Sequence, residues 1–368
     1  MMRRTLLVMI VLVFITLFVV TVNASSTVDV KIDDYIPENI KKSLPDGIFD
    51  YESASIPDKL SFSYFAQSIK NAFTSVAGSY TADLATLVAL LITASLFHLL
   101  SQSTKGELES AFSTVSSLCV CVYIFTVVAT LFDTVSEYLG TIASFATAVT
   151  PVISIAYAAG GNMSAAAVST SGLMLSIAVI ENICAYFLYP LLSLVAVMSV
   201  ASSLSPGIRI NTLTSFLRGV MMLGISFTVT AISAIMSLQH TLACATDTLG
   251  ARAVRFAVSS FIPIVGSAVS EAVRTVAGSV GYIRSSVGGI GIVVVILITL
   301  PVFVSLMFVR INIAVGASFS DMLGCERETQ VLKQASSLVN VLIALVALSA
   351  FMFVYFLTLL LKCSSAYA

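Results

Sequence analysis

The chain has very little charge for its length. Only 10% of its 368 residues are charged, whereas 58% are hydrophobic, and the mean hydropathy is +1.03. A soluble domain carries about 25% charged residues because its surface must be solvated. Most of this protein's surface therefore faces something other than water, and the chain length does not indicate two soluble domains.

Residue types that carry chemistry are also scarce. The chain has 18 basic and 19 acidic residues, a net charge of −1 and no basic tract, so nucleic acid is not an expected partner. It has only two histidines, and its six cysteines lack metal-ligand spacing, so we expect no metal and no cofactor. The sequence contains no glycine-rich loop that would bind a nucleotide phosphate. If the protein uses an energy source, we therefore expect a partner protein to supply it.

Residues 1–24 have the pattern of a secretory signal. Arg3 and Arg4 precede an apolar run from Leu6 to Val22, and Ala24 then provides a small residue at the cleavage position. An uncleaved signal anchor is the alternative, because the run is long for a signal and short for a span. Both interpretations place the following residues outside the cytoplasm.

Two short segments separate this signal from the apolar body of the chain. Residues 25–60 are acidic and contain three prolines, so they are expected to form a short extracytoplasmic arm. Residues 61–80 carry apolar side chains at three- and four-residue spacing, which predicts an amphipathic helix at the membrane interface.

The remainder, 81–368, is predicted to be an all-α, multi-spanning membrane domain with about seven or eight spans. The apolar runs that define these spans are 83–100, 111–132, 140–159, 164–180, 184–203, 219–238, 286–308 and 337–361. Lysine and arginine in short loops favour the cytoplasmic side, which places loops 101–110, 204–218 and 309–336 inside. This orientation requires 164–203 to form two spans that turn at Glu181-Asn182, and one long tilted helix is the alternative.

Few ionisable groups lie at membrane depth. His98, Asp133 and Glu181 fall at predicted span ends, where a turn or snorkelling explains them. A proton-coupled transporter is therefore disfavoured, because such proteins carry acids or histidines well inside several spans. Ser318 follows a small-residue turn, but no histidine is nearby in the sequence, so an intramembrane enzyme is also disfavoured.

Segment 251–285 differs from the other loops. Two amphipathic helices flank a Pro263 to Gly266 break, which predicts a hairpin that either re-enters the membrane and lines a polar path or lies on its surface. The candidate structural or gating residues are Arg252, Arg255, Phe261, Pro263, Gly266, Glu271 and Arg274. No catalytic, cofactor-binding or metal-binding residue is assigned.

This hairpin also carries a family resemblance. Arg252-Ala-Val-Arg255-Phe256, Phe261-Ile-Pro-Ile-Val-Gly266 and Ser270-Glu271-Ala272 resemble the corresponding segment of the stage III sporulation protein AE family. Members often have a second glycine where Ser267 stands and aspartate where Glu271 stands, and both differences are mild. The order of signal, acidic arm, small-residue spans, hairpin and final spans extends the resemblance over nearly the whole chain.

The resemblance implies a function that composition and periodicity do not. Such proteins are non-enzymatic, multi-pass subunits of the mother-cell membrane around the engulfed forespore. They belong to a channel complex, similar to secretion machinery, that includes ring-forming subunits and a separate ATPase. A self-contained permease for a small solute is the main alternative, and an intramembrane enzyme is a third.

Overall fold

The computed structural model describes residues 62–103, 107–204, 211–261 and 266–362, and all of these segments are helical apart from two tight turns. The helices are α4 (Phe62–Ser103), α5 (Glu107–Ala159), α6 (Met163–Ile183), the π-helix η2 (Cys184–Leu188), α7 (Tyr189–Leu204), α8 (Asn211–Phe261), α9 (Gly266–Met322) and α10 (Glu326–Lys362). The predicted all-α class is confirmed. The signal at 1–24 and the arm at 25–60 lie outside the described residues.

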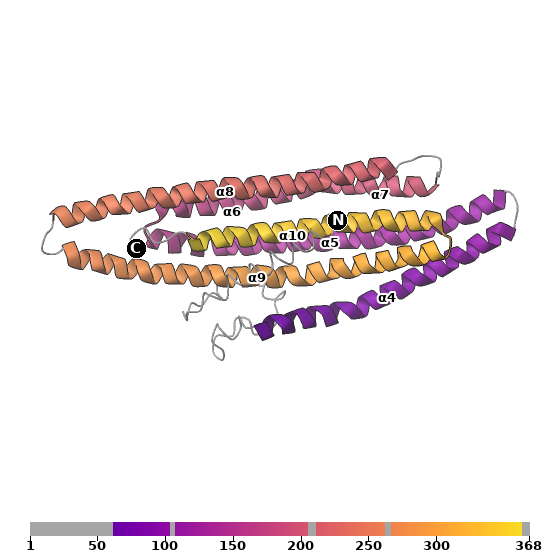
Figure 1. Ribbon diagram of the computed structural model, residues 1–368, viewed down its shortest axis with the longest axis horizontal. Helices are drawn as coiled ribbons and strands as arrows, with labels where there is room; N and C mark the ends of the chain where they lie inside the picture. Colours follow the sequence, from indigo (N-terminus) through magenta and orange to yellow (C-terminus); the bar gives the residue numbers. More distant parts are fainter. Residues whose placement is uncertain (1–61, 104–106, 205–210, 262–265, 363–368) are drawn as a thin grey trace.

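The helices form an elongated up-and-down bundle (Figure 1). Helices α4, α7 and α9 terminate at one end of the bundle, and α5 and α8 terminate at the other. Within the described residues, six helical segments are long and apolar enough to cross a membrane. They are Tyr80–Leu99, Thr114–Ala159, Met163–Val195, Thr212–Ala253, Gly288–Met322 and Glu326–Leu359.

The last helix, α10, is the centre of the bundle. It packs against α9, α8, α5 and α7, and 72% of the residues in its most apolar window are buried, compared with 17–44% in the other five segments. Leu332, Leu342 and Val346 on α10 are at most 1% exposed. The core is therefore a layer of side chains around α10, closed by neighbouring helices on several sides.

Two predicted boundaries between spans, at 133–139 and at 181–183, are not present in the structure. Segments 111–132 and 140–159 belong to one helix, α5, because Asp133 and Glu137 lie on its exposed surface and require no turn. Likewise, 163–204 is helical throughout. Glu181 is exposed, and the Asn182 side-chain amide donates a hydrogen bond to the Ala178 carbonyl of its own helix, 2.6 Å away.

The π-helix explains how this long segment passes through a proline. Pro190 lacks a backbone N–H, and its ring crowds the carbonyl one turn earlier. In η2, the Tyr189 N–H bonds to the Cys184 carbonyl five residues back, which is the wider π-type spacing. The helix thus continues into α7 immediately after the widened turn.

The segment expected to be an interfacial helix is the first part of α4, which runs without a break from Phe62 to Ser103. Its position relative to a membrane stays a prediction. Pro151 and Pro301 are both accommodated inside long helices, α5 and α9. The two tight turns use glycine in the left-handed region, at Gly161 (φ 79°) and Gly324 (φ 74°), a conformation that glycine adopts without steric cost.

Candidate functional site

The predicted gating residues lie around one helical hairpin. Arg252, Arg255 and Phe261 fall in the last turns of α8, and Gly266, Glu271 and Arg274 fall in the first turns of α9. Pro263 lies in 262–265, outside the described residues. The two helices meet at the same end of the bundle (Figure 1).

Side-chain placement is described for only part of this hairpin. Arg252 is exposed, and Phe256 exposes 74% of its surface. The backbone is helical on both sides of the break, as the sequence predicts. Membrane re-entry and a gating role for these residues stay predictions.

A buried hydroxyl network links three helices in the core. The Tyr138 hydroxyl on α5 lies 3.2 Å from the Thr299 hydroxyl on α9 and 3.4 Å from the Ser349 hydroxyl on α10. All three residues are at most 3% exposed. Thr299 and Ser349 also donate to carbonyls of their own helices, Val295 and Val346. The network therefore fixes helix register and leaves no open polar space at this position.

A second polar cluster joins α8 to the turn between α5 and α6. The Asp247 carboxylate accepts hydrogen bonds from the backbone N–H groups of Ser164 (3.0 Å) and Ala165 (2.8 Å) at the start of α6. Two turns earlier on α8, His240 Nε2 lies 3.1 Å from the Tyr157 hydroxyl on α5. A carboxylate at a helix N-terminus satisfies unpaired N–H groups and the positive end of the helix dipole.

A third cluster lies at the turn between α9 and α10. Ser116 on α5 donates to the buried Glu328 carboxylate over 2.9 Å, and Thr329 donates to Ser320 over 3.0 Å. Burial, followed by the nearby Glu328 charge, raises the pKa of the Cys325 thiol. The α9–α10 turn lies toward the end of the bundle opposite the α8–α9 hairpin (Figure 1).

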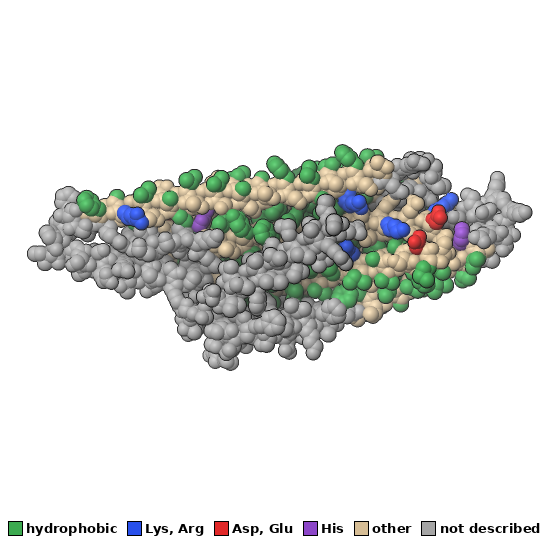
Figure 2. Space-filling model, viewed as in Figure 1, with side chains coloured by type: hydrophobic (Ala, Val, Ile, Leu, Met, Phe, Trp, Pro, Cys, Tyr) green, Lys and Arg blue, Asp and Glu red, His purple; other side chains and the backbone are tan. Residues whose placement is uncertain are grey.

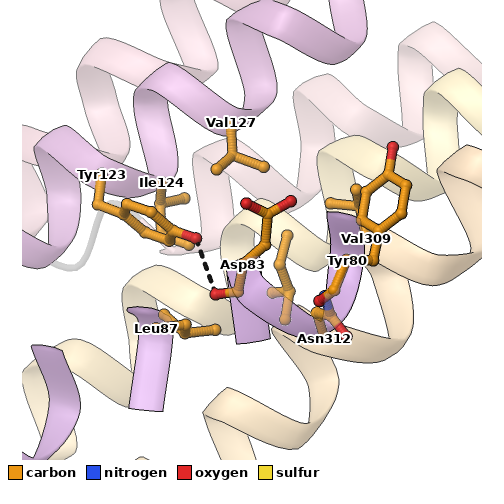
Figure 3. Close-up of a pocket in the computed structure, with 9 residues that line it drawn as sticks. Tyr80, Asp83, Leu87, Tyr123, Ile124, Val127, Val309 and Asn312 are labelled. Carbon is orange, nitrogen blue, oxygen red and sulfur yellow. Dashed lines mark hydrogen bonds between the residues drawn. The ribbon is translucent and has the colours of Figure 1, made fainter. Parts of the chain in front are cut away.

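A small pocket opens where α4, α5 and α9 meet (Figure 3). Its lining residues are Tyr80, Asp83, Leu87, Tyr123, Ile124, Val127, Val309, Asn312 and Ile313. The Tyr123 hydroxyl donates to the Asp83 backbone carbonyl over 3.0 Å, and the Asn312 amide donates to the Tyr80 carbonyl over 2.8 Å. These hydrogen bonds tie three helices together around the pocket.

The outer face of α8 carries a stripe of exposed large apolar side chains, called here the α8 stripe. Its members are Leu213, Phe216, Leu223, Phe227, Ile235, Leu238, Leu242, Leu249 and Phe256, each at least 50% exposed. Their spacing keeps them on one side of a helix. Figure 2 shows hydrophobic side chains along this edge of the molecule.

The described segments contain no group of side chains arranged for catalysis or metal binding. No group of three or more His, Cys, Asp or Glu residues there is placed to hold a metal ion. Ser318 is exposed and donates to the Ala314 carbonyl of its own helix. The clusters around His240 and Asp247 were not identified from the sequence. Their seven-residue spacing places them on one face of α8 and is a signal that could have found them.

The family pattern of stage III sporulation protein AE matches residues 52–364. The chain belongs to the stage III sporulation protein AE family. A curated relative is the stage III sporulation protein AE of Bacillus subtilis (strain 168), which is 25% identical over 235 residues. That alignment covers 61% of this chain and 57% of the relative. No solved structure matches the chain significantly.

Family membership and the helical bundle agree on the class of protein. The chain is a multi-pass membrane protein of a sporulation family. The resemblance carried by the α8–α9 hairpin is confirmed, because the family match includes that hairpin and nearly all of the described helices.

Proposed function

We propose that the protein is a non-enzymatic membrane subunit of a transenvelope channel, similar to a secretion apparatus, that connects mother cell and forespore during endospore formation. Its bundle would lie in the mother-cell membrane around the forespore, with the N-terminal arm outside the cytoplasm. Other subunits of the complex, including ring-forming subunits and a separate ATPase, would be its partners. The family match over residues 52–364 carries this proposal.

The closed core supports a role as one subunit among several. Apolar side chains of α5, α8 and α9 pack around α10, and the buried hydroxyls of Tyr138, Thr299 and Ser349 bond to one another and to their own helices. A conduit through the middle of such a bundle would require this packing to separate. A path between subunits requires no such change.

The α8 stripe supports contacts with other proteins. From Leu213 to Phe256 the stripe extends roughly 65 Å at 1.5 Å per residue, whereas the hydrocarbon core of a bilayer is about 30 Å thick. Lipid therefore covers only part of the stripe if α8 stands across the membrane. Apolar surface outside the bilayer is costly in water, so a protein partner would cover the remainder.

A self-contained permease for a small solute is the second candidate. The scarcity of charge at membrane depth and the filled core around α10 both weigh against it. Reconstitution separates the two functions: a permease transports solute alone in liposomes, whereas the proposed subunit is inert without its partners.

The deciding experiment is deletion of the gene in the endospore-forming host. We expect cells to complete engulfment and then to stop, with few heat-resistant spores, and a wild-type copy should restore sporulation. A copy with Phe227→Asn and Leu238→Asn on the α8 stripe should reach the membrane but complement poorly. Ile155→Asn, at an exposed position on α5, is the matched control. Normal sporulation by the deletion strain would overturn the proposal.

A further inference from the structure

The pocket between α4, α5 and α9 contains hydrogen-bond acceptors that are open. Tyr123 and Asn312 donate to backbone carbonyls, and the Tyr80 hydroxyl is bonded to that of Ser305. Within the described segments, no donor or base contacts the Asp83 carboxylate, and none contacts Asn312 Oδ1. An unpaired carboxylate beside an open amide oxygen favours a donor or a cation.

The aromatic rings strengthen this selection. Figure 3 shows the Asp83 carboxylate between the side chains of Tyr123 and Tyr80. The Tyr80 ring is held by stacking on Phe308, with ring centroids 5.8 Å apart. The negative faces of tyrosine rings attract ammonium groups, so the rings and the carboxylate favour the same kind of ligand.

The size of the pocket limits the cation. Its cavity volume is about 20 Å³, enough for one water-sized group. A primary ammonium group fits this space, whereas a trimethylammonium group does not. The floor is apolar, formed by Leu87, Ile124 and Val309, and offers no ligands for a multivalent ion.

The position of the pocket indicates which kind of molecule supplies the ammonium group. Asp83 lies near the start of the candidate span Tyr80–Leu99, where an unpaired carboxylate next to lipid is costly. On α5, the exposed apolar residues Val122 and Phe125 flank Tyr123, so apolar surface adjoins the carboxylate. We propose that this pocket binds a primary ammonium group, supplied by the headgroup of phosphatidylethanolamine.

The test uses the purified full-length protein in detergent, with added phosphatidylethanolamine, phosphatidylcholine or phosphatidylglycerol. Native mass spectrometry should show retention of phosphatidylethanolamine over the other two lipids, and that lipid should raise the unfolding temperature. Asp83→Asn should abolish both effects. Glu137→Gln, which neutralises another exposed acid on α5, should leave them unchanged.

A second variant guards against a folding defect in Asp83→Asn. Val127→Met fills the pocket and keeps the carboxylate, and it should also abolish retention of the lipid. Equal retention of phosphatidylethanolamine by wild type and both variants would overturn the proposal. Stabilisation by potassium or ammonium chloride that depends on Asp83, with no effect of phosphatidylethanolamine, would overturn the lipid source and assign the pocket to a free cation.

Discussion

Gly316 shows at the scale of one residue how closely these helices approach. A Cβ atom at this position on α9 would lie 2.6 Å from Leu87 Cδ2 and 3.2 Å from its Cγ on α4. Leu87 is only 2% exposed and has little space into which to move. The small residue at this position thus allows a close contact between two helices of the chain.

We therefore expect Gly316→Ala to destabilise the bundle by about 1–3 kcal/mol, the usual cost of overpacking. Gly172→Ala should cost less, because its Cβ would meet the flexible Met236 side chain. Gly140→Ala, with nothing within 4 Å, is the control and should be neutral or stabilising. Thermal unfolding in detergent measures all three. Equal effects at Gly316 and Gly140 would show that α4 and α9 are not in close contact.

Cys325 provides a test that depends on pH. Because burial and Glu328 raise the pKa of its thiol, less thiolate is present at neutral pH than in an ordinary cysteine, and the thiolate is the reactive form. In a variant with Cys325 as the single cysteine, the alkylation rate should be low near pH 8. The rate should continue to increase with pH above the range in which the rate of an ordinary thiol, with pKa near 8.5, has reached its plateau.

Met322→Cys in a cysteine-free chain supplies the exposed comparison, since Met322 is 84% exposed. Glu328→Gln removes the neighbouring charge and should shift the Cys325 profile to lower pH. A Cys325 profile identical to that of Met322→Cys would contradict the burial of this turn.

At the scale of single elements, local sequence signals explain most helices but not their ends. Asp133, Glu137 and Glu181 resemble turn markers in an apolar chain, yet each lies on an exposed helix surface. The boundary between α5 and α6 instead falls at Gly160-Gly161, where the chain reverses through a left-handed glycine. A contact from another helix, the Asp247 carboxylate, then caps α6.

We expect Asp247→Ala to destabilise the protein by about 1–2 kcal/mol, because it leaves two N–H groups at the start of α6 without an acceptor. Asp247→Asn keeps one acceptor oxygen and should cost less. Chemical unfolding in detergent measures both, and Thr246→Ala, an exposed neighbour on α8, is the control. An unchanged stability in Asp247→Ala would remove the link between α8 and α6.

At the scale of the whole molecule, the two span boundaries that are missing, within α5 and within α6–α7, have opposite effects on the predicted topology and cancel. Each merger removes one crossing. Helices α4, α7 and α9 therefore still terminate at one end of the bundle, as the basic residues near these helix ends predict (Figure 1). Only the turn at 160–162 changes sides. It lies at the end of the bundle where α8 terminates and α9 begins, and away from the α9–α10 turn.

Labelling of single cysteines distinguishes the two topologies. Met163 and Met322 are both exposed, at 66% and 84%. In the bundle they lie at opposite ends, so Met163→Cys and Met322→Cys should react with a membrane-impermeant maleimide from opposite sides. Leu213→Cys should label from the same side as Met322→Cys. Labelling of both methionine positions from one side would support the two-span interpretation of 164–203.

The sequence by itself determined the class of this protein and its family. Apolar runs of spanning length with little charge indicate membrane helices, in which every backbone group is satisfied within the segment, and the hairpin motif around 251–272 carried the resemblance. Only the tertiary structure decided which helices are continuous, that α10 is the centre, and that Asp83, Tyr123 and Asn312 share a pocket. Those features depend on contacts between residues far apart in the chain, such as Asn312 with Tyr80, and local spacing contains no information about them.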